Sequence, residues 1–584
     1  MNKSLLTVCG AACAALAGLS SSTLAEGPAP AALVTVSSTL PQPQIDGATG
    51  SVPLNYAASY AWNAFIALNW PAQPGMRDTP AANQPFGQSG AVPVWETMRS
   101  KVELYPGNAS ADVGPHGTVI VNHVATNGPD YGYGQAPDYI YSPKDVMSPD
   151  GRVAACPGQP PVGVPAWFSL DETTQIGVNQ TYAGVLPAVD SSGYNSKPRL
   201  IRYAVKMNQA VYDTIVSGQY WYSGANSPLA KASANYKAAL AAGQSNDPAM
   251  PYADFAPPAT DPPGPAGIEV KTSWRPLTGK EAASGRFFKA SVRYYETSAG
   301  APCYREAEWG LVGMHLISFS SAAPWVIWST FEQADNILST DGKPLEDADG
   351  RALIGPLVTP TTPSLSSNPN LVDPSVVKSG AFCANPGARL YFRENPQGGK
   401  LPSGGDICVN HRWQPIPASI IAVNAQAHRA IRDYLKANGG TSSPWLYYKL
   451  VNVQGTPVDA SGMNGGTFST TSSYYLANVT IETDYSLGMF TGDLTNNNVP
   501  SNVTPPPPGG TTPIPYYNTR LLPFQARRLG DLLSPEQMGG CAGCHGFAAT
   551  IGQDFSFALG NNVKKPEPAN AFETHEFRVY FGPH

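Results

Sequence analysis

The sequence predicts an α+β fold that is mostly β: a large β-rich body with a few helices, followed by a C-terminal attachment segment for a cofactor. Charged residues make up only 13% of the chain, whereas 57 glycines and 58 prolines punctuate it. Short apolar runs and alternating stretches typical of strands lie between these turn-rich segments. At 584 residues the chain is too long for one ordinary domain.

Residues 1–25 have the layout of a secretory signal peptide. A short charged start precedes an apolar stretch from Leu5 to Leu19, and small residues lead to a cleavage site expected after Ala25. We therefore expect a periplasmic protein, or a secreted one. After residue 25 no apolar run approaches the ~20 residues that span a bilayer, so no transmembrane segment is expected in the mature chain.

Residues 26–246 are predicted to form an N-terminal β-rich region, and the Pro-dense residues 247–267 a linker or a surface loop. The N-terminal region is expected to contain two helices and at least two strands. The expected helices lie within Tyr56–Trp70 and Ala230–Ala242, and the strands at Gly117–His123 and Leu200–Val205.

Residues 268–499 form the predicted central region, in which four apolar or alternating runs indicate strands. These runs are Ile268–Lys271, Phe287–Tyr295, Leu311–Phe319 and Trp325–Trp328. A long helix is expected at Ile420–Ala437, ended by two glycines. Residues 500–515 include four consecutive prolines and should form a stiff connector. The C-terminal segment, residues 516–584, follows.

The cysteines indicate an oxidising compartment. Two of the eight lie in the signal peptide and two in the motif described next, which leaves an even remainder of four. Two disulfides are therefore expected. Cys383–Cys408 is the favoured pair because it closes a short loop, and Cys156–Cys303 follows by elimination, although three pairings are open.

Cys541-Ala542-Gly543-Cys544-His545 is the C-x-x-C-H signature of covalent c-type haem attachment. Two thiols at this spacing can each form a thioether with one porphyrin, and the adjacent histidine can bind the iron. Chance would produce about 0.0015 such motifs in a chain of this composition. The alternatives are a disulfide or half of a zinc site, but zinc would need a second Cys/His pair at similar spacing. We therefore expect one covalent haem c held by Cys541, Cys544 and His545.

The haem segment itself is short. Only 39 residues follow His545, too few to enclose a haem, so the body of the protein is expected to supply most of the pocket.

Several runs in the second half of the chain resemble a bacterial family whose members are usually called cytochrome c family protein. They are Ile268–Lys271, Trp309–Leu316, Trp328–Glu332, Tyr447–Val451, Leu476–Thr483 and the C-x-x-C-H motif. The similarity covers roughly residues 260–560 and implies a periplasmic protein with a single haem, but no particular activity. The long Pro-rich insertion between Thr483 and Cys541 departs from the family pattern.

The ligand on the second face of the haem separates an electron carrier from a catalyst. His545 is the expected proximal ligand. His315 is the first choice for the distal ligand because it lies in an apolar strand of the family-like region; otherwise it is a buried histidine satisfied by the backbone. Met489 and His575 are the rivals. Met538 lies too close to Cys541 to reach the distal face, and His428 could be only a surface or capping histidine of the long helix.

Other candidate residues carry weaker signals. Glu332 and Asp335 could act as acid–base groups near a haem, but carboxylates capping a turn are the favoured interpretation. Arg527 and Arg528 could pair with haem propionates or form a solvated face. The net charge of −6 argues against a nucleic-acid partner. The chain has no second haem motif, which argues against a dihaem peroxidase.

These observations lead to one preferred function and two alternatives. The preferred function is electron transfer by a periplasmic single-haem c-type cytochrome, with a redox protein or a small-molecule electron donor or acceptor as partner. The first alternative is a haem c oxidoreductase, peroxidase- or oxygenase-like, because the chain is far larger than shuttling one electron requires. The second is a non-enzymatic secreted binding protein.

Overall fold

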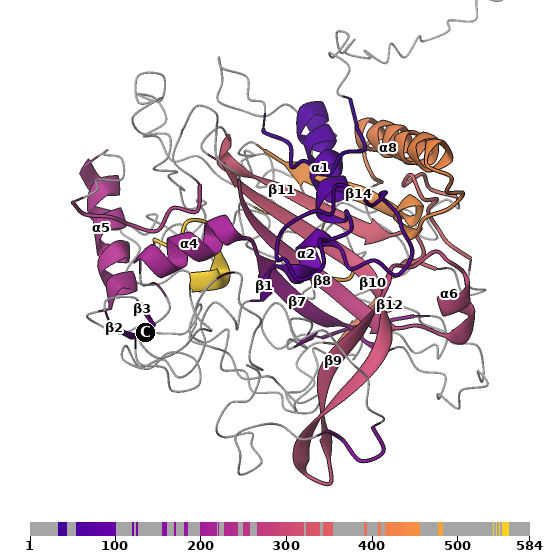
Figure 1. The fold of residues 1–584 in the computed structure, drawn as a ribbon, viewed down its shortest axis with the longest axis horizontal. Helices are drawn as coiled ribbons and strands as arrows, with labels where there is room; N and C mark the ends of the chain where they lie inside the picture. Colours follow the sequence, from indigo (N-terminus) through magenta and orange to yellow (C-terminus); the bar gives the residue numbers. More distant parts are fainter. Residues whose placement is uncertain are drawn as a thin grey trace, which may run out of the picture. The chain divides into compact units, whose positions relative to one another are not determined.

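The structure of the protein is a computed structural model (Figure 1). It describes residues 33–43, 54–100, 120–121, 124–125, 133, 155–159, 169–170, 180–184, 199–218, 220, 227–242, 249–256, 266–320, 323–338, 343–353, 390–393, 407–409, 415–455, 477–482, 541, 545, 548 and 552–559. Within these residues a large antiparallel sheet forms the centre of the fold and a few helices pack around it, so the predicted α+β, mostly β class is confirmed.

The central sheet has eight strands, six of which lie side by side in the order β1-β7-β8-β10-β11-β14. Their bounds are β1 Arg99–Ser100, β7 Arg202–Met207, β8 Gly267–Pro276, β10 Ala301–Ser320, β11 Ala323–Gln333 and β14 Tyr448–Gln454. Strand β9, Lys289–Ser298, pairs with the first half of β10, and β4, Ser169–Leu170, pairs in parallel with β9. The runs predicted as strands at 268–271, 287–295, 311–319 and 325–328 correspond to β8, β9, β10 and β11.

The register divides the sheet into two faces of different chemistry, because residues directly opposite on antiparallel strands point to the same side. His315 on β10 lies opposite Lys271 on β8 and Thr330 on β11. The neighbouring set on this face is Glu269, Ile317 and Trp328. We call this the polar face and define it by Glu269, Lys271, Ser273, His315, Ile317, Trp328, Thr330 and Glu332.

The opposite, apolar face forms the main hydrophobic core. Strand residues such as Val270, Met314 and Leu316 point into it. Helices α1, Leu54–Leu68, and α8, Ala418–Ala437, pack against this side of β14 and against each other. Burying a large apolar side chain contributes roughly 1.5–3 kcal/mol, so this layer supplies much of the stability of the fold.

Aromatic rings join helix α1 to the sheet. Phe65 of α1 stacks on Phe331 of β11 with ring centroids 4.4 Å apart, and Trp62 meets Phe331 edge-on at 5.2 Å. The indole N–H of Trp62 donates to Oδ1 of Asn424 on α8 at 2.8 Å, which satisfies both buried polar groups. Helix α1 is apolar on nearly every side because it is buried on nearly every side.

The remaining elements are shorter. The helices are α2 Val94–Thr97, α4 Gln209–Gly218, α5 Pro228–Ala242 and α6 Gly279–Ala283, with 3-10 turns at Pro444–Tyr447 and Phe557–Leu559. A four-stranded sheet has the order β13-β12-β5-β6, and β2 pairs with β3. Their bounds are β2 Ile120–Val121, β3 Val124–Ala125, β5 Gln180–Ala183, β6 Arg199–Leu200, β12 Leu390–Arg393 and β13 Ile407–Cys408. The helices predicted within 56–70, 230–242 and 420–437 are present as α1, α5 and α8.

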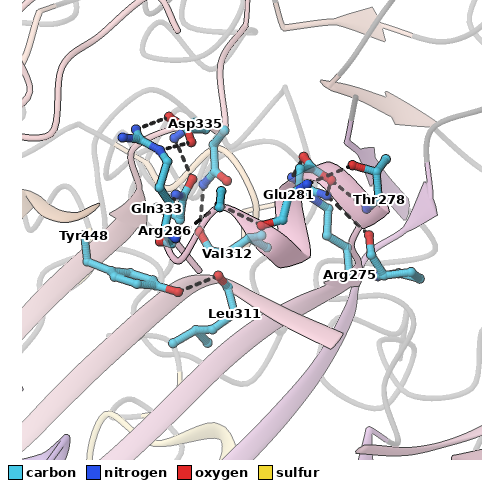
Figure 2. Close-up of polar contacts among 12 residues, drawn as sticks. Arg275, Thr278, Glu281, Arg286, Leu311, Val312, Gln333, Asp335 and Tyr448 are labelled. Atoms are coloured by element: carbon cyan, nitrogen blue, oxygen red, sulfur yellow. Dashed lines mark hydrogen bonds and ion pairs between the residues drawn. The ribbon is translucent and has the colours of Figure 1, made fainter. Parts of the chain in front are cut away.

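A polar network closes one end of the sheet around helix α6 (Figure 2). Thr278 and Glu281 form a reciprocal capping box at the start of α6, and Glu281 also pairs with the buried Arg275 at 2.8 Å. Arg286 pairs with Asp335 at 2.6 Å just beyond β11. Asp335, considered in the sequence as an acid–base group, therefore forms a structural ion pair, in line with the favoured interpretation of carboxylates at a turn.

The central sheet contains strands from both predicted regions: β1 and β7 precede residues 247–267, and β8, β10 and β11 follow them. Within the Pro-dense segment, Tyr252 and Phe255 are buried. The domain boundaries themselves stay a prediction. Residues 1–25 and 500–515 lie outside the described residues, as do most of residues 516–584.

The predicted Cys156–Cys303 disulfide is present and ties residues 155–159 to the start of β10. Cys383 lies outside the described residues, so its pairing with Cys408 stays a prediction. None of the helices in the described part of the chain is both long and apolar enough to span a membrane.

Candidate functional site

The motif histidine His545 lies against the polar face of the central sheet. Its ring centroid is 4.6 Å from that of Trp328 on β11 and 4.8 Å from that of Phe557. Cys541 and His545 both have helical backbone conformation. A cofactor held by His545 would therefore adjoin the aromatic surface around Trp328.

The geometry of His545 determines which ring nitrogen can bind iron. Nδ1 lies 2.9 Å from the carbonyl oxygen of Phe555. A carbonyl can only accept a hydrogen bond, so Nδ1 carries the hydrogen and Nε2 keeps its lone pair. Burial lowers the pKa of His545 to about 4, so the ring is neutral at neutral pH. A metal-binding histidine commonly donates its second N–H to a carbonyl in this way.

The acceptor carbonyl is held by an unusual turn. Asp554 and Phe555 have φ angles of 51° and 60°, and the nearby Gly552 has 83°. Two successive non-glycine residues in the left-handed region cost about 1–2 kcal/mol each. Side chains of this turn are almost completely buried, Phe555 among them. Its packing therefore stabilises a backbone that directs the Phe555 carbonyl to His545.

His315 lies on the same polar face. Its Nε2 atom is buried, and no described residue forms a hydrogen bond with it. The nearest carboxylate oxygen, Oε1 of Glu482, lies 3.2 Å away but outside hydrogen-bond geometry. Burial, followed by the charges of Lys271 and His545, holds the pKa of His315 well below its usual range. His315 is thus a neutral imidazole with a buried nitrogen available for a ligand, although its side chain is 13% exposed.

A tight turn, residues 477–482, covers this part of the polar face, and its role was not predicted from the sequence. Asn478 anchors the turn by donating from Nδ2 to Oγ1 of Thr330 and to the carbonyl of Phe331, at 3.0 and 2.8 Å. Its backbone N–H donates to Oε2 of Glu482 at 2.5 Å. This bond positions the carboxyl group of Glu482 beside His315.

The turn also explains the structural role of Glu332. Its Oε1 atom accepts the backbone N–H of Val479 at 2.8 Å, so Glu332 is a buried anchor for the turn. Burial raises the pKa of Glu482 to about 8, which Lys271 partly offsets and Glu332 reinforces. Of these two carboxyl groups, that of Glu482 adjoins His315, with Oε1 3.2 Å from its Nε2 atom.

Gly313 makes room for the turn on the sheet. A Cβ atom at this position would lie 2.5 Å from both Ser273 Oγ and Thr480 Oγ1 and 3.1 Å from Asn478 Oδ1. The sequence signals that could have indicated this packing are the two glycines of the run Trp309–Leu316 and the polar run at 478–482.

The interpretation of His428 as a surface or capping histidine is wrong. It is fully buried on α8, with Nδ1 2.6 Å from Oδ1 of Asp349 and Nε2 2.9 Å from the carbonyl oxygen of Tyr448. Both ring nitrogens therefore have partners within the core, which leaves none for iron. The pairing of His428 with Asp349 could not be predicted from the sequence because the two residues are 79 positions apart in the chain.

Of the residues predicted to contact the haem, the structure brings His315 and His545 to one face of the sheet. Cys541 is partly buried. The others lie outside the described residues, and their roles stay predictions: Cys544, Met489, Met538, His575, Arg527 and Arg528. Among the described residues no group of three or more His, Cys, Asp or Glu is arranged to hold a metal ion.

The described residues fit a haem in two respects. His545 has a fixed tautomer with Nε2 available, and His315 presents a second buried nitrogen without a hydrogen bond. The aromatic rings of Trp328 and Phe557 supply an apolar surface next to His545.

Comparison with known proteins finds no protein-family model, curated protein or solved structure that matches this chain. The resemblance to the cytochrome c family thus rests on the quoted sequence runs and stays a prediction.

Proposed function

We propose that this protein is a periplasmic single-haem c-type cytochrome that transfers electrons. Haem c is bonded to Cys541 and Cys544, and His545 is the proximal ligand. The observation that carries the proposal is the hydrogen bond from His545 Nδ1 to the Phe555 carbonyl, which directs the lone pair to Nε2. The C-x-x-C-H spacing supports it independently.

The haem supplies reversible one-electron chemistry, and the chain's own residues set the conditions for it. His545 binds through Nε2, and the Phe555 carbonyl fixes the orientation of its ring. Trp328 and Phe557 flank that ring and exclude water from it. The partner is a redox protein or a small-molecule electron donor or acceptor.

His315 is our proposed distal ligand. The support is its buried Nε2 atom without a hydrogen bond, on the same sheet face that receives His545. An orphaned polar atom in a buried site ordinarily costs about 1–3 kcal/mol, and binding a metal would remove that cost.

Removing the thioether bonds tests the proposal. The exported wild-type protein should give a pyridine haemochrome spectrum typical of two thioethers. Cys541→Ala combined with Cys544→Ala should abolish covalent haem, whereas the matched substitution Cys156→Ala with Cys303→Ala, at the disulfide, should retain it. Covalent haem that persists in the motif variant would refute the assignment.

A specific observation favours a second candidate, a haem c oxidoreductase of peroxidase- or oxygenase-like type. Glu482 places a buried carboxyl oxygen 3.2 Å from Nε2 of His315, and such a pair can exchange a proton with a bound substrate. In this case His315 would not bind the iron. Carbon monoxide distinguishes the two: a closed six-coordinate iron in the reduced protein indicates electron transfer, whereas ready binding indicates a catalytic site.

A further inference from the structure

The turn at residues 552–559 makes more contacts with the body than holding His545 requires. Besides the Phe555 carbonyl, two of its side chains form hydrogen bonds with segments nearly 300 residues away in sequence. Asp554 Oδ2 accepts the backbone N–H of Phe255 at 2.5 Å, and Ser556 Oγ donates to Oε1 of Glu269 at 3.0 Å. Both side chains are buried.

The partners of these two hydrogen bonds, Glu269 and Phe255, are themselves held in place. Glu269 lies on β8, on the polar face, in the same row as Trp328. Phe255 is buried and meets Phe319 of β10 edge-on at 5.4 Å. The turn is therefore held by a strand of the central sheet and by the segment that precedes it, and Trp328 contacts both His545 and Phe555.

Close backbone packing supports the same arrangement. Gly552 has a φ angle of 83°, and a Cβ atom there would lie 2.7 Å from the Cα atom of Ser233 on α5. Within the turn, Ser556 also accepts the Ala558 N–H at 3.0 Å, and Gln553 donates from its backbone to the Ala548 carbonyl at 2.9 Å. The turn is thus fitted both to helix α5 and to Ala548, three residues after the motif histidine.

We propose that residues 552–559 are a docking turn that seats His545 on the polar face, with Asp554 and Ser556 as positioning residues. This inference rests on the proposed haem attachment. Asp554 joins the turn to the Phe255 backbone and Ser556 joins it to Glu269. Between these two points the Phe555 carbonyl is directed to His545, so the docking turn couples the position of the proximal histidine to the body.

The test compares Asp554→Ala with Asp554→Asn in the full-length, exported protein. Asparagine keeps an acceptor for the Phe255 N–H and tolerates a positive φ angle, whereas alanine does neither. Alanine should leave covalent haem content unchanged but accelerate hydrogen exchange of the 552–559 backbone about tenfold. It should also shift the reduction potential, and asparagine should restore both properties.

Ser556→Ala provides a second, independent test, with Glu269→Gln as its control because glutamine keeps an acceptor oxygen. The alanine variant should show the same rise in hydrogen exchange, and circular dichroism should confirm that both variants fold. Wild-type exchange and potential in Asp554→Ala, or equal disruption by Asp554→Asn, would overturn the docking turn. If the wild-type protein carries no covalent haem, the proposed function fails, but the exchange comparison still decides on the docking turn.

Discussion

At the scale of single residues, His545 and His315 differ in the hydrogen bonds that their ring nitrogens form. The Phe555 carbonyl fixes the hydrogen of His545 on Nδ1. His315 Nε2, in contrast, lacks a hydrogen bond within the described structure even though Glu482 lies 3.2 Å from it. The tautomer of His545 is therefore fixed by the Phe555 carbonyl, whereas no hydrogen bond within the described structure fixes Nε2 of His315.

Replacing His315 tests its proposed ligation. His315→Ala should open a coordination position, shift the Soret band toward a high-spin form and permit carbon monoxide binding. His315→Met is the matched control, because a thioether can still bind iron and should keep the low-spin spectrum while raising the reduction potential. An unchanged spectrum in His315→Ala would refute ligation and direct attention to Met489 and His575.

The buried pair of His428 and Asp349 makes the stability of the protein depend on pH. Hydrogen bonding to His428 is the main cause that lowers the pKa of Asp349 to about 2. A carboxyl group whose pKa is lowered by folding stabilises the fold at pH values above its unfolded-state pKa of 3.8. That contribution is lost as the pH falls toward 2.

Urea unfolding between pH 6 and pH 3 measures this effect. The wild type should lose stability over this interval, and Asp349→Asn should lose about 1 kcal/mol less because its side chain does not titrate. Asp347→Asn, in the same loop but without a bond to His428, should retain the wild-type dependence. Equal slopes in the wild type and Asp349→Asn would contradict the assignment.

At the scale of elements, the site depends on how closely irregular segments approach the sheet. The turn at 477–482 lies over β10 because Gly313 has no side chain, and Asn478 then fastens it to Thr330 and Phe331. Neither the turn nor the sheet would by itself position Glu482 beside His315. The sheet provides the rigid surface and the turn provides the carboxyl group.

Gly313→Ala tests this packing. The added methyl group would lie 2.5 Å from two side-chain oxygens, so the variant should lose about 1–3 kcal/mol of unfolding free energy. Gly279→Ala is the control, since a Cβ there meets nothing within 4 Å and lies in helix α6. It should be neutral or slightly stabilising. Chemical denaturation of both variants decides the matter, and equal stabilities would contradict the packing.

At the scale of the whole molecule, covalent and non-local contacts join distant parts of the chain. The Cys156–Cys303 bond spans 147 residues, and the segment at 552–559 contacts residues near 255 and 269. The central sheet therefore contributes Trp328 to the surface against which His545 lies.

Mass spectrometry under non-reducing conditions tests the cysteine assignment. No free thiol should be found among Cys156, Cys303, Cys383 and Cys408. Cys156→Ser with Cys303→Ser should lower the unfolding free energy by about 2–4 kcal/mol because the bridge restricts the unfolded chain. Alkylation of all four cysteines in the exported protein would overturn the assignment.

The sequence by itself determined the features that depend on residues close together in the chain. The spacing of Cys541, Cys544 and His545 predicts the cofactor. Apolar patterns predicted helices α1 and α8 and strands β8 to β11, and an alanine-rich composition predicted α5. That the body supplies the haem pocket stays a prediction; the structure shows His545 against Trp328 of the central sheet.

Only the tertiary structure decided which groups meet across the sheet. His428 has the same side chain as His315, yet Asp349 and the Tyr448 carbonyl occupy both of its nitrogens. Glu482 reaches His315 only through the anchoring of Asn478. Periodicity shows which face a side chain occupies, but the partner on that face comes from a segment tens or hundreds of residues away, and its position depends on close packing that no local pattern encodes.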